Sequence, residues 1–188
     1  LNTFVITGFT TLGNGVSGFT AQNLGAGKYD RIKRGTLQAL VIVSLLAAVA
    51  VGLGLLVMRN DFFYHIFLSA DKVTPEAVRY GNTLLRVDFA MYLFLGFIFV
   101  VRNCVQGIGK PQFILGAGTA ELAARVLVCL FVPAALAGGA VSADAPALAY
   151  FALCAADPVA WMAADAVLLV PFLRNIMKMD YRYLKGTM

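Results

Sequence analysis

The sequence predicts an all-α integral membrane helical bundle with about five transmembrane helices, and two observations predict it. First, 60% of the residues are hydrophobic and only 13% are charged, with a mean hydropathy of +0.80. An average soluble domain has about 25% charged residues. Second, the charges gather in short clusters, and the apolar runs between them are long enough to cross a ~30 Å hydrocarbon core. A soluble domain of 188 residues with this composition would leave a large apolar surface in water.

The apolar runs place the individual spans. The first is rich in Gly, Thr and Ser, which let helices approach closely inside a bundle. The second carries no charge, and Thr74-Pro75-Glu76 predicts the start of the third helix, with Thr74 as its cap. The segment at about 60–73 mixes aromatic and charged residues and is expected to lie at the membrane interface, and residues 174–188 form a basic tail. The predicted spans are about 3–27, 36–58, 80–106, 111–136 and 147–173.

A tight basic turn joins the third and fourth spans. Gly107 and Gly109 can take backbone angles closed to other residues, and Pro111 suits the first turn of a new helix. Glu121 and Arg125 follow inside the fourth span, one helical turn apart. A lone charge near a helix centre costs about 2.5–3.5 kcal/mol on insertion scales, so a pair is expected. The pair is interpreted first as a structural contact, and otherwise as an acid that exchanges a proton or cation while Arg125 restrains it.

Two further acids lie in apolar surroundings. Asp88 stands at the boundary of the third span, and it is either a cation or proton site or a carboxylate at headgroup level. Asp165 lies in the last span, two turns after the pair Asp157-Pro158. Pro158 is expected to kink this span if Asp157 is already helical. Alternatively, Pro158 lies in the first turn of the span and Asp157 caps it.

The residues that support enzymatic or metal chemistry are sparse. The three cysteines show no metal or disulfide spacing, and His65 is the only histidine. The spans contain no serine–histidine pair and no histidine cluster. We therefore expect no enzymatic activity, no bound metal and no organic cofactor. The net charge of +5 is explained by membrane topology, so no nucleic-acid partner is expected.

The basic residues also predict the orientation of the chain. They gather at residues 28–34, at the turn of Arg102 and Lys110, and in the tail, whereas the loop at 137–146 has no Lys or Arg. Basic ends therefore alternate with less basic ends. By the positive-inside rule, the chain is a multi-pass protein of the cell membrane that begins outside and ends in the cytoplasm.

Several stretches, taken in order, are similar to one transporter family. They are FTAQNLGAGKYDRIKRG at 19–35, LLRVDFAMYLFLGFIFVVRNCVQGIGKP at 84–111, ELAARV from Glu121, and PVAWMAADAVLLVPFLR from Pro158. Together they resemble helices eight to twelve of the MATE (multidrug and toxic compound extrusion) family, in its C-terminal lobe. The likeness covers nearly the whole chain.

This resemblance implies twelve helices in two similar lobes and a mechanism of alternating access. The implied function is efflux of organic, often cationic, compounds in exchange for Na⁺ or H⁺. The implied partners are membrane lipid, a small organic substrate, and a first lobe in the same protein or in a partner half. Some relatives carry an acid midway along helix ten, where this chain has Leu95. The candidate acids are Asp88, Glu121 and Asp165, and the supporting polar residues are Arg125, Gln22, Asn23 and Tyr92.

Two other functions remain open at this stage. One is a flippase of the same superfamily that moves a lipid-linked precursor. Its cavity would be more basic, whereas the only well-buried base expected here is Arg125, which has a partner. The other is a membrane scaffold or half-transporter subunit that does not itself transport.

Overall fold

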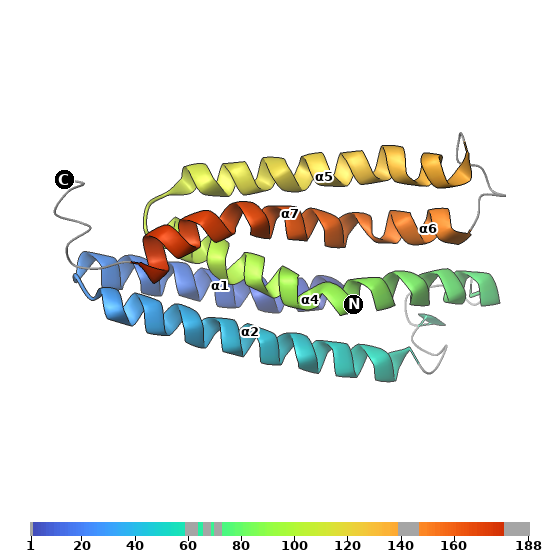
Figure 1. Ribbon diagram of the computed structural model, residues 1–188. Helices are drawn as coiled ribbons and strands as arrows, with labels where there is room; N and C mark the ends of the chain where they lie inside the picture. Colours follow the sequence, from blue (N-terminus) through green and yellow to red (C-terminus); the bar gives the residue numbers. More distant parts are fainter. Residues whose placement is uncertain (1, 59–63, 66–68, 70–72, 139–146, 179–188) are drawn as a thin grey trace.

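The chain folds into long helices, as the computed structural model shows for residues 2–58, 64–65, 69, 73–138 and 147–178 (Figure 1). No strand occurs in these ranges, which confirms the predicted all-α class. A π-helix, Phe172–Met177, continues the last helix. The helices are α1 (Asn2–Gly25), α2 (Tyr29–Val57), α4 (Pro75–Gly107), α5 (Pro111–Ala137), α6 (Ala147–Cys154) and α7 (Ala156–Pro171).

Four segments of the described chain are long and apolar enough to cross a membrane. Helix α1 is not among them, although its 24 residues extend over about 36 Å. Large apolar side chains such as Leu45, Leu122 and Leu130 are strongly exposed on the outer faces, as expected where lipid replaces water. The fifth span, α1, stays a prediction. The four segments are Tyr29–Leu56, Pro75–Gly107, Pro111–Ala137 and Leu148–Met177.

Helix α4 is the centre of the bundle. Helices α1, α2 and α7 pack directly on it, whereas α5 packs mainly on α6 and α7 (Figure 1). The middle of α4 is accordingly buried, with Tyr92, Ile98 and Val101 almost fully enclosed. The bundle therefore has a three-helix part around α4 and a hairpin of α5 with α6 and α7.

Small residues bring α1 and α2 close to α4. A Cβ atom on Gly107 would lie 2.6 Å from the Ser17 carbonyl oxygen, and one on Gly96 would lie 2.9 Å from Cγ2 of Val43. Beside Gly107, the Thr20 hydroxyl donates a hydrogen bond to Sγ of Cys104 at 3.5 Å. Inside lipid the hydrophobic effect does not drive helices together, so close packing of this kind stabilises their association.

The turn between α4 and α5 agrees with the prediction. Helix α4 ends at Gly107, Gly109 has a left-handed φ of +73°, and Pro111 is the first residue of α5. The Lys110 ammonium donates to Oδ1 of Asn175 at 2.7 Å, which ties the turn to the π-helix. The start of α4 is also confirmed, because the Thr74 hydroxyl accepts a hydrogen bond from the Ala77 amide.

The start of the second helix differs from the prediction, and parts of three other predicted segments lie outside the described residues. Helix α2 begins at Tyr29, before the predicted start of the second span at residue 36, so the basic residues at 31–34 lie in its first turns. A basic side chain that extends to the interface is compatible with a helical backbone, which a pattern of apolar residues alone misses. Most of the predicted interfacial segment at 60–73, the loop at 139–146 and the tail from 179 lie outside the described residues.

The last span is interrupted close to Pro158. Helix α6 ends at Cys154, and α7 begins at Ala156, so the break precedes Pro158 by one turn. Pro158 has no amide hydrogen to donate to the carbonyl group four residues earlier, which explains the position of the break. The interruption is confirmed, but the alternative of Asp157 as a cap is wrong, because α7 has no side-chain cap.

Candidate functional site

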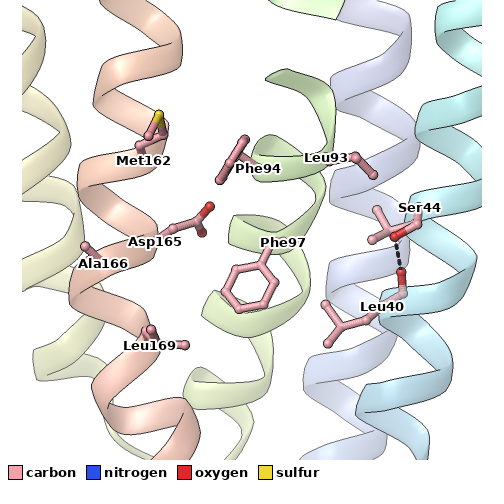
Figure 2. Close-up of a pocket in the computed structure, with 10 residues that line it drawn as sticks. Leu40, Ser44, Leu93, Phe94, Phe97, Met162, Asp165, Ala166 and Leu169 are labelled. Atoms are coloured by element: carbon pink, nitrogen blue, oxygen red, sulfur yellow. Dashed lines mark hydrogen bonds between the residues drawn. The ribbon is translucent and has the colours of Figure 1, made fainter. Parts of the chain in front are cut away.

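A pocket of about 570 Å³ lies between α2, α4 and α7. Helices α2 and α7 both pack on α4, and the pocket lies between them over the surface of α4 (Figure 2). Its walls are mainly apolar. They include Val43 and Ser44 of α2, Phe94 and Phe97 of α4, and Met162 and Asp165 of α7.

Asp165 is the only acid among the residues that line this pocket. Its side chain extends from α7 toward Phe94 and Phe97, and the residue is only 9% exposed (Figure 2). Neither carboxylate oxygen has a hydrogen-bond partner among the residues that the structure describes. A buried carboxylate without a hydrogen bond is unfavourable in apolar surroundings, so a proton or a cation would stabilise it.

The polar groups near Asp165 do not neutralise it. The Ser44 hydroxyl, on the opposite wall, donates to the Leu40 carbonyl oxygen at 2.8 Å within its own helix. The positive charge of Arg102, on α4, interacts electrostatically with Asp165. The Arg102 guanidinium, however, makes its ion pair with Glu121. Asp165 therefore remains the one strong polar feature of an apolar pocket.

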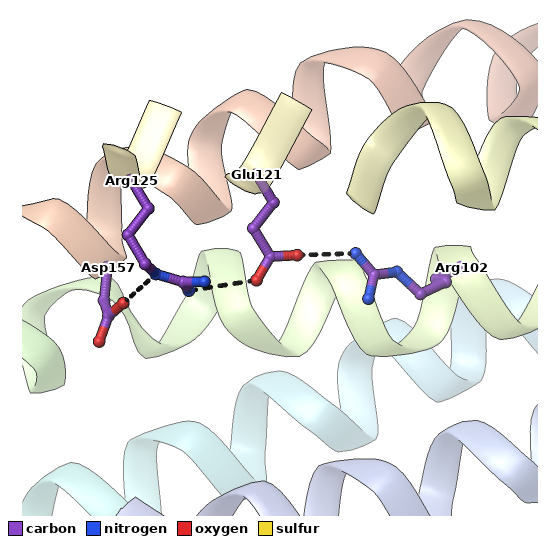
Figure 3. Close-up of polar contacts among 4 residues, drawn as sticks. All are labelled: Arg102, Glu121, Arg125 and Asp157. Carbon is purple, nitrogen blue, oxygen red and sulfur yellow. Dashed lines mark hydrogen bonds and ion pairs between the residues drawn. The ribbon is translucent and has the colours of Figure 1, made fainter. Parts of the chain in front are cut away.

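A second set of charges joins α4, α5 and α7 (Figure 3). Arg102 Nη2 lies 2.9 Å from Oε2 of Glu121, and Arg125 Nη2 lies 3.3 Å from Oε1 of the same carboxylate. Arg125 also donates from Nε to Oδ1 of Asp157 at 2.7 Å. We call Arg102, Glu121, Arg125 and Asp157 the ion-pair chain. Its two acids and two bases leave no net charge.

The predicted contact between Glu121 and Arg125 is thus present, and its functional role stays a prediction. Sequence reasoning missed both outer members of the ion-pair chain. Arg102 was assigned to topology, and Asp157 was considered only as a cap or as part of a kink. Their pairing depends on how three helices pack, and no local spacing in the sequence reports that.

The other candidate residues lie elsewhere in the bundle. Asp88 and Tyr92 are each 1% exposed on the buried face of α4, where the Tyr92 ring contacts the rings of Phe9 and Phe89. Asn23 is buried and donates to the Phe19 carbonyl oxygen, and Gln22 is exposed. None of these candidates lines the pocket of Asp165. The predicted transport roles of Asp88, Gln22, Asn23 and Tyr92 therefore remain predictions.

The pocket does not resemble a metal centre. In the described part of the chain, no three His, Cys, Asp or Glu residues lie close enough together to hold a metal ion. Within the pocket, the side-chain oxygens come from Asp165 and Ser44 only. The arrangement offers a single negative charge in an apolar wall, which suits a proton or an organic cation better than a hard metal ion with several oxygen ligands.

Comparison with protein families assigns the chain. A family model described as MatE matches residues 1–132, which include α1, α2, α4 and most of α5. The chain belongs to the MatE family. MatE proteins are transporters rather than enzymes, so the chain is part of a multi-pass membrane transporter. The resemblance predicted from the sequence is thereby confirmed. Comparison with curated proteins and with solved structures gives no match.

The match with the MatE model ends before the last membrane segment. Helix α7 and Asp165 lie beyond residue 132, whereas the two other walls of the pocket, from α2 and α4, lie inside the matched region. The pocket therefore combines residues inside the matched region with residues beyond it.

Proposed function

We propose that the protein containing this chain is an efflux antiporter that exports organic, often cationic, compounds in exchange for Na⁺ or H⁺. Membership of the MatE family supports the transport part of the proposal. The observation that carries the coupling part is Asp165, a carboxylate without a partner among the described residues, in an apolar pocket between three helices. An acid inside a membrane is costly, and such residues commonly serve ion or substrate pathways.

Asp165 is better suited to exchange an ion than Glu121. The Glu121 carboxylate has an arginine on each oxygen, and both would have to be displaced or compensated whenever it took up a cation. Asp165 makes no hydrogen bond with a described residue that must break first. We therefore assign the exchange step to Asp165 and a structural role to the ion-pair chain.

The surroundings of Asp165 favour H⁺ over Na⁺ as the coupling ion. Ser44 supplies the only other side-chain oxygen in the pocket, and its hydrogen bond to Leu40 holds it within α2. Hard metal cations usually collect several oxygen ligands, whereas a proton needs only one. Na⁺ remains the alternative that the experiment below distinguishes.

In the proposed mechanism, two lobes rock about a central cavity, and the passage of the coupling ion drives export. Asp88 and Glu121 are secondary candidate acids, and Gln22, Asn23 and Tyr92 are supporting polar groups. The protein would act in the cell membrane with its C-terminus in the cytoplasm. Its partners would be membrane lipid, a small organic substrate and a second lobe, without an organic cofactor or nucleic acid.

The lining of the pocket supports efflux of cations over transport of a lipid-linked precursor. A flippase for an anionic lipid carrier would be expected to expose basic side chains to its ligand. No Lys or Arg lines the pocket. Arg125, which the sequence predicted to be well buried, is 38% exposed at its side chain and is paired with Glu121 and Asp157.

The test is transport by the full-length protein in sealed liposomes. An imposed proton gradient should drive export of a fluorescent cationic dye, and a sodium gradient alone should not. Asp165→Asn should reduce gradient-driven export at least tenfold. Glu121→Gln should retain coupling when equal amounts of the reconstituted proteins are compared. Absence of gradient-driven export by the unmodified protein contradicts the proposal, and export driven only by sodium contradicts the choice of ion.

A further inference from the structure

We propose that the first turns of α4 bind the phosphate group of an anionic phospholipid, with Arg79, Asn82 and Arg86 as hydrogen-bond donors. A groove of about 350 Å³ lies at these turns. It shares no lining residue with the pocket of Asp165, and its ligand has the opposite charge, so the proposal is independent of the transport function. The groove is lined by Pro75, Val78, Arg79, Asn82, Thr83 and Arg86.

The length of α4 places this groove at the membrane surface. Helix α4 has 33 residues, whereas about 20 residues cross the hydrocarbon core. Twenty residues centred on the uncharged run at 89–101 extend from about 85 to about 105. Arg86 therefore lies at the boundary of the core, and Arg79 lies about 10 Å further out. In Figure 1 the first turns of α4 accordingly extend past the end of α2.

Three tyrosines from different segments support the same depth. The Tyr64 hydroxyl donates to Oδ1 of Asn82 at 2.9 Å, beside the groove. The Tyr150 hydroxyl donates to the Tyr80 carbonyl oxygen at 3.0 Å, and the centroids of these two rings lie 4.7 Å apart. Tyrosine is enriched where a membrane meets water, because its ring is apolar and its hydroxyl is polar. The groove therefore opens at the level of the lipid headgroups.

The polar side chains of the groove are arranged to donate hydrogen bonds. The bond from Tyr64 occupies Oδ1 of Asn82, so the two N–H donors of Nδ2 remain for a ligand. Arg86 is exposed and makes no hydrogen bond or ion pair with a described residue. Nη2 of Arg79 donates to the Tyr80 hydroxyl at 3.4 Å, and its Cζ lies 5.1 Å from the centroid of the Tyr80 ring. The other N–H groups of Arg79 are available to a ligand.

Helix geometry brings these donors to one face. Positions 79, 82 and 86 are three and four residues apart, so their side chains are neighbours on the helix surface. Helical side chains lean toward the N-terminus, so Arg86 extends from the core boundary outward, in the direction of Asn82. Each planar guanidinium group can hold two oxygens of one phosphate. The face therefore offers two such groups with an amide between them.

The charge of the groove selects an anionic lipid. Two bases and no acid line it. Glu76, one turn before Arg79, is exposed and makes no ion pair with a described residue, and Asp88 lies on the buried face of α4. A zwitterionic headgroup would bring a cation beside the two arginines, which is unfavourable. Because Arg86 lies at the core boundary, we expect a phosphate that is anchored in the bilayer rather than one in free solution.

The experiment titrates the full-length protein in detergent with dioleoylphosphatidylglycerol and measures bound lipid by native mass spectrometry. Dioleoylphosphatidylcholine should bind about fivefold more weakly, and dioleoylglycerol, which has no phosphate, should not be retained. Arg79→Gln combined with Arg86→Gln should weaken binding of phosphatidylglycerol at least about tenfold. The matched control is Arg31→Gln combined with Arg34→Gln, which removes the same charge from exposed positions of α2. It should change binding less than about twofold.

Asn82→Asp is a second variant that preserves the local structure. Its carboxylate still accepts the hydrogen bond from Tyr64 but places a negative charge between the two arginines. Binding of phosphatidylglycerol should fall about tenfold. Arg86→Lys keeps the charge and loses the planar guanidinium, so it should weaken binding about twofold to fivefold. This milder change keeps the proposal testable if the other variants do not yield folded protein.

The outcomes distinguish a lipid site from its alternatives. Unchanged binding in the arginine variants, or an equal loss in the control on α2, overturns the proposal and indicates general surface electrostatics. Displacement of phosphatidylglycerol by millimolar inorganic phosphate also overturns it, because the site would then bind a free anion. Equal retention of dioleoylglycerol would indicate a groove for acyl chains only. Lipid binding is measured without a gradient or a dye, so failure of the proposed efflux leaves this test intact.

Discussion

Two acids on neighbouring helices, Glu121 of α5 and Asp165 of α7, meet opposite surroundings. Each oxygen of Glu121 contacts an arginine, from its own helix on one side and from α4 on the other. Neither oxygen of Asp165 has a hydrogen-bond partner among the described residues. Both residues are acids within apolar segments, so residue type and hydropathy do not distinguish them. Their partners do: Glu121 forms ion pairs with two arginines, whereas Asp165 has no hydrogen-bond partner among the described residues.

The difference follows from how each helix is held. Helix α4 meets α1 and α2 through small residues and close backbone approach. Helix α5 buries few side chains, and its packing surface is mainly toward α6 and α7. Apolar contact with a neighbour gives little net stabilisation where lipid is equally apolar, so polar contacts are more important for α5. The ion-pair chain supplies them, linking α5 to both α4 and α7 (Figure 3).

The largest effect on stability is expected from Glu121→Ala. The substitution removes the ion-pair partner of Arg102 and leaves Arg125 with Asp157 only. Breaking a buried pair costs about 3–5 kcal/mol, and the 21% exposure of the Glu121 side chain reduces this to roughly 2–3 kcal/mol. Equilibrium unfolding in detergent micelles measures the loss. Leu122→Ala, on the exposed face of the same helix, is the control; a loss no larger than in the control would remove the structural role of Glu121.

A second change gives Asp165 a partner like that of Glu121. Leu169 follows Asp165 by four residues, lines the same pocket and is partly exposed, so Leu169→Lys repeats the spacing of Glu121 and Arg125. The new ammonium should occupy the carboxylate and reduce export driven by a proton gradient about tenfold, or about 1.4 kcal/mol. Dye export by the full-length protein in sealed liposomes measures this effect.

The matched control is Val170→Lys, which adds the same charge one residue later. Val170 is exposed and does not line the pocket. If both lysine variants reduce export equally, general electrostatic repulsion explains the loss, and the specific pairing with Asp165 is refuted.

A smaller effect is expected from Arg125→Lys. The Arg125 guanidinium uses Nε for Asp157 and Nη2 for Glu121, so one side chain bonds two acids on different helices. A lysine ammonium lacks this planar fork and cannot reproduce both contacts in the same geometry. We expect a loss of about 1 kcal/mol, below the roughly 1.5–3 kcal/mol of a buried hydrogen bond to a charged group because the Arg125 side chain is 38% exposed. Unfolding of Arg125→Lys with and without Asp157→Asn measures the coupling, and strict additivity would contradict a shared contact.

The same two sites show what the sequence could predict. The contact of Glu121 with Arg125 was predictable because helix geometry alone places residues four apart on one face. The tight turn at Gly109 was predictable because its chemistry is local. The partnership of Arg125 with Asp157 was not, since it depends on the packing of α5 against α7.

The pocket was beyond the reach of sequence patterns for a related reason. Asp165 was a candidate because an acid stands out in an apolar run. The residues facing it, such as Ser44 and Phe94, read as ordinary members of membrane helices. Only the arrangement of α2 and α7 on α4 shows that these side chains share one cavity with Asp165.

The smallest effect on stability is expected from Asp165→Asn. The substitution removes a charge but no hydrogen bond with a described residue, so unfolding should change by less than about 0.5 kcal/mol. Burying a neutral amide in apolar surroundings costs less free energy than burying an ionised carboxylate. This gain offsets the cost of the unpaired N–H donors of the asparagine. Equilibrium unfolding of Asp165→Asn beside Glu121→Ala, in the same detergent, tests the comparison directly. A loss at Asp165 as large as at Glu121 would mean that the Asp165 carboxylate stabilises the fold, and its availability to a cation would no longer follow.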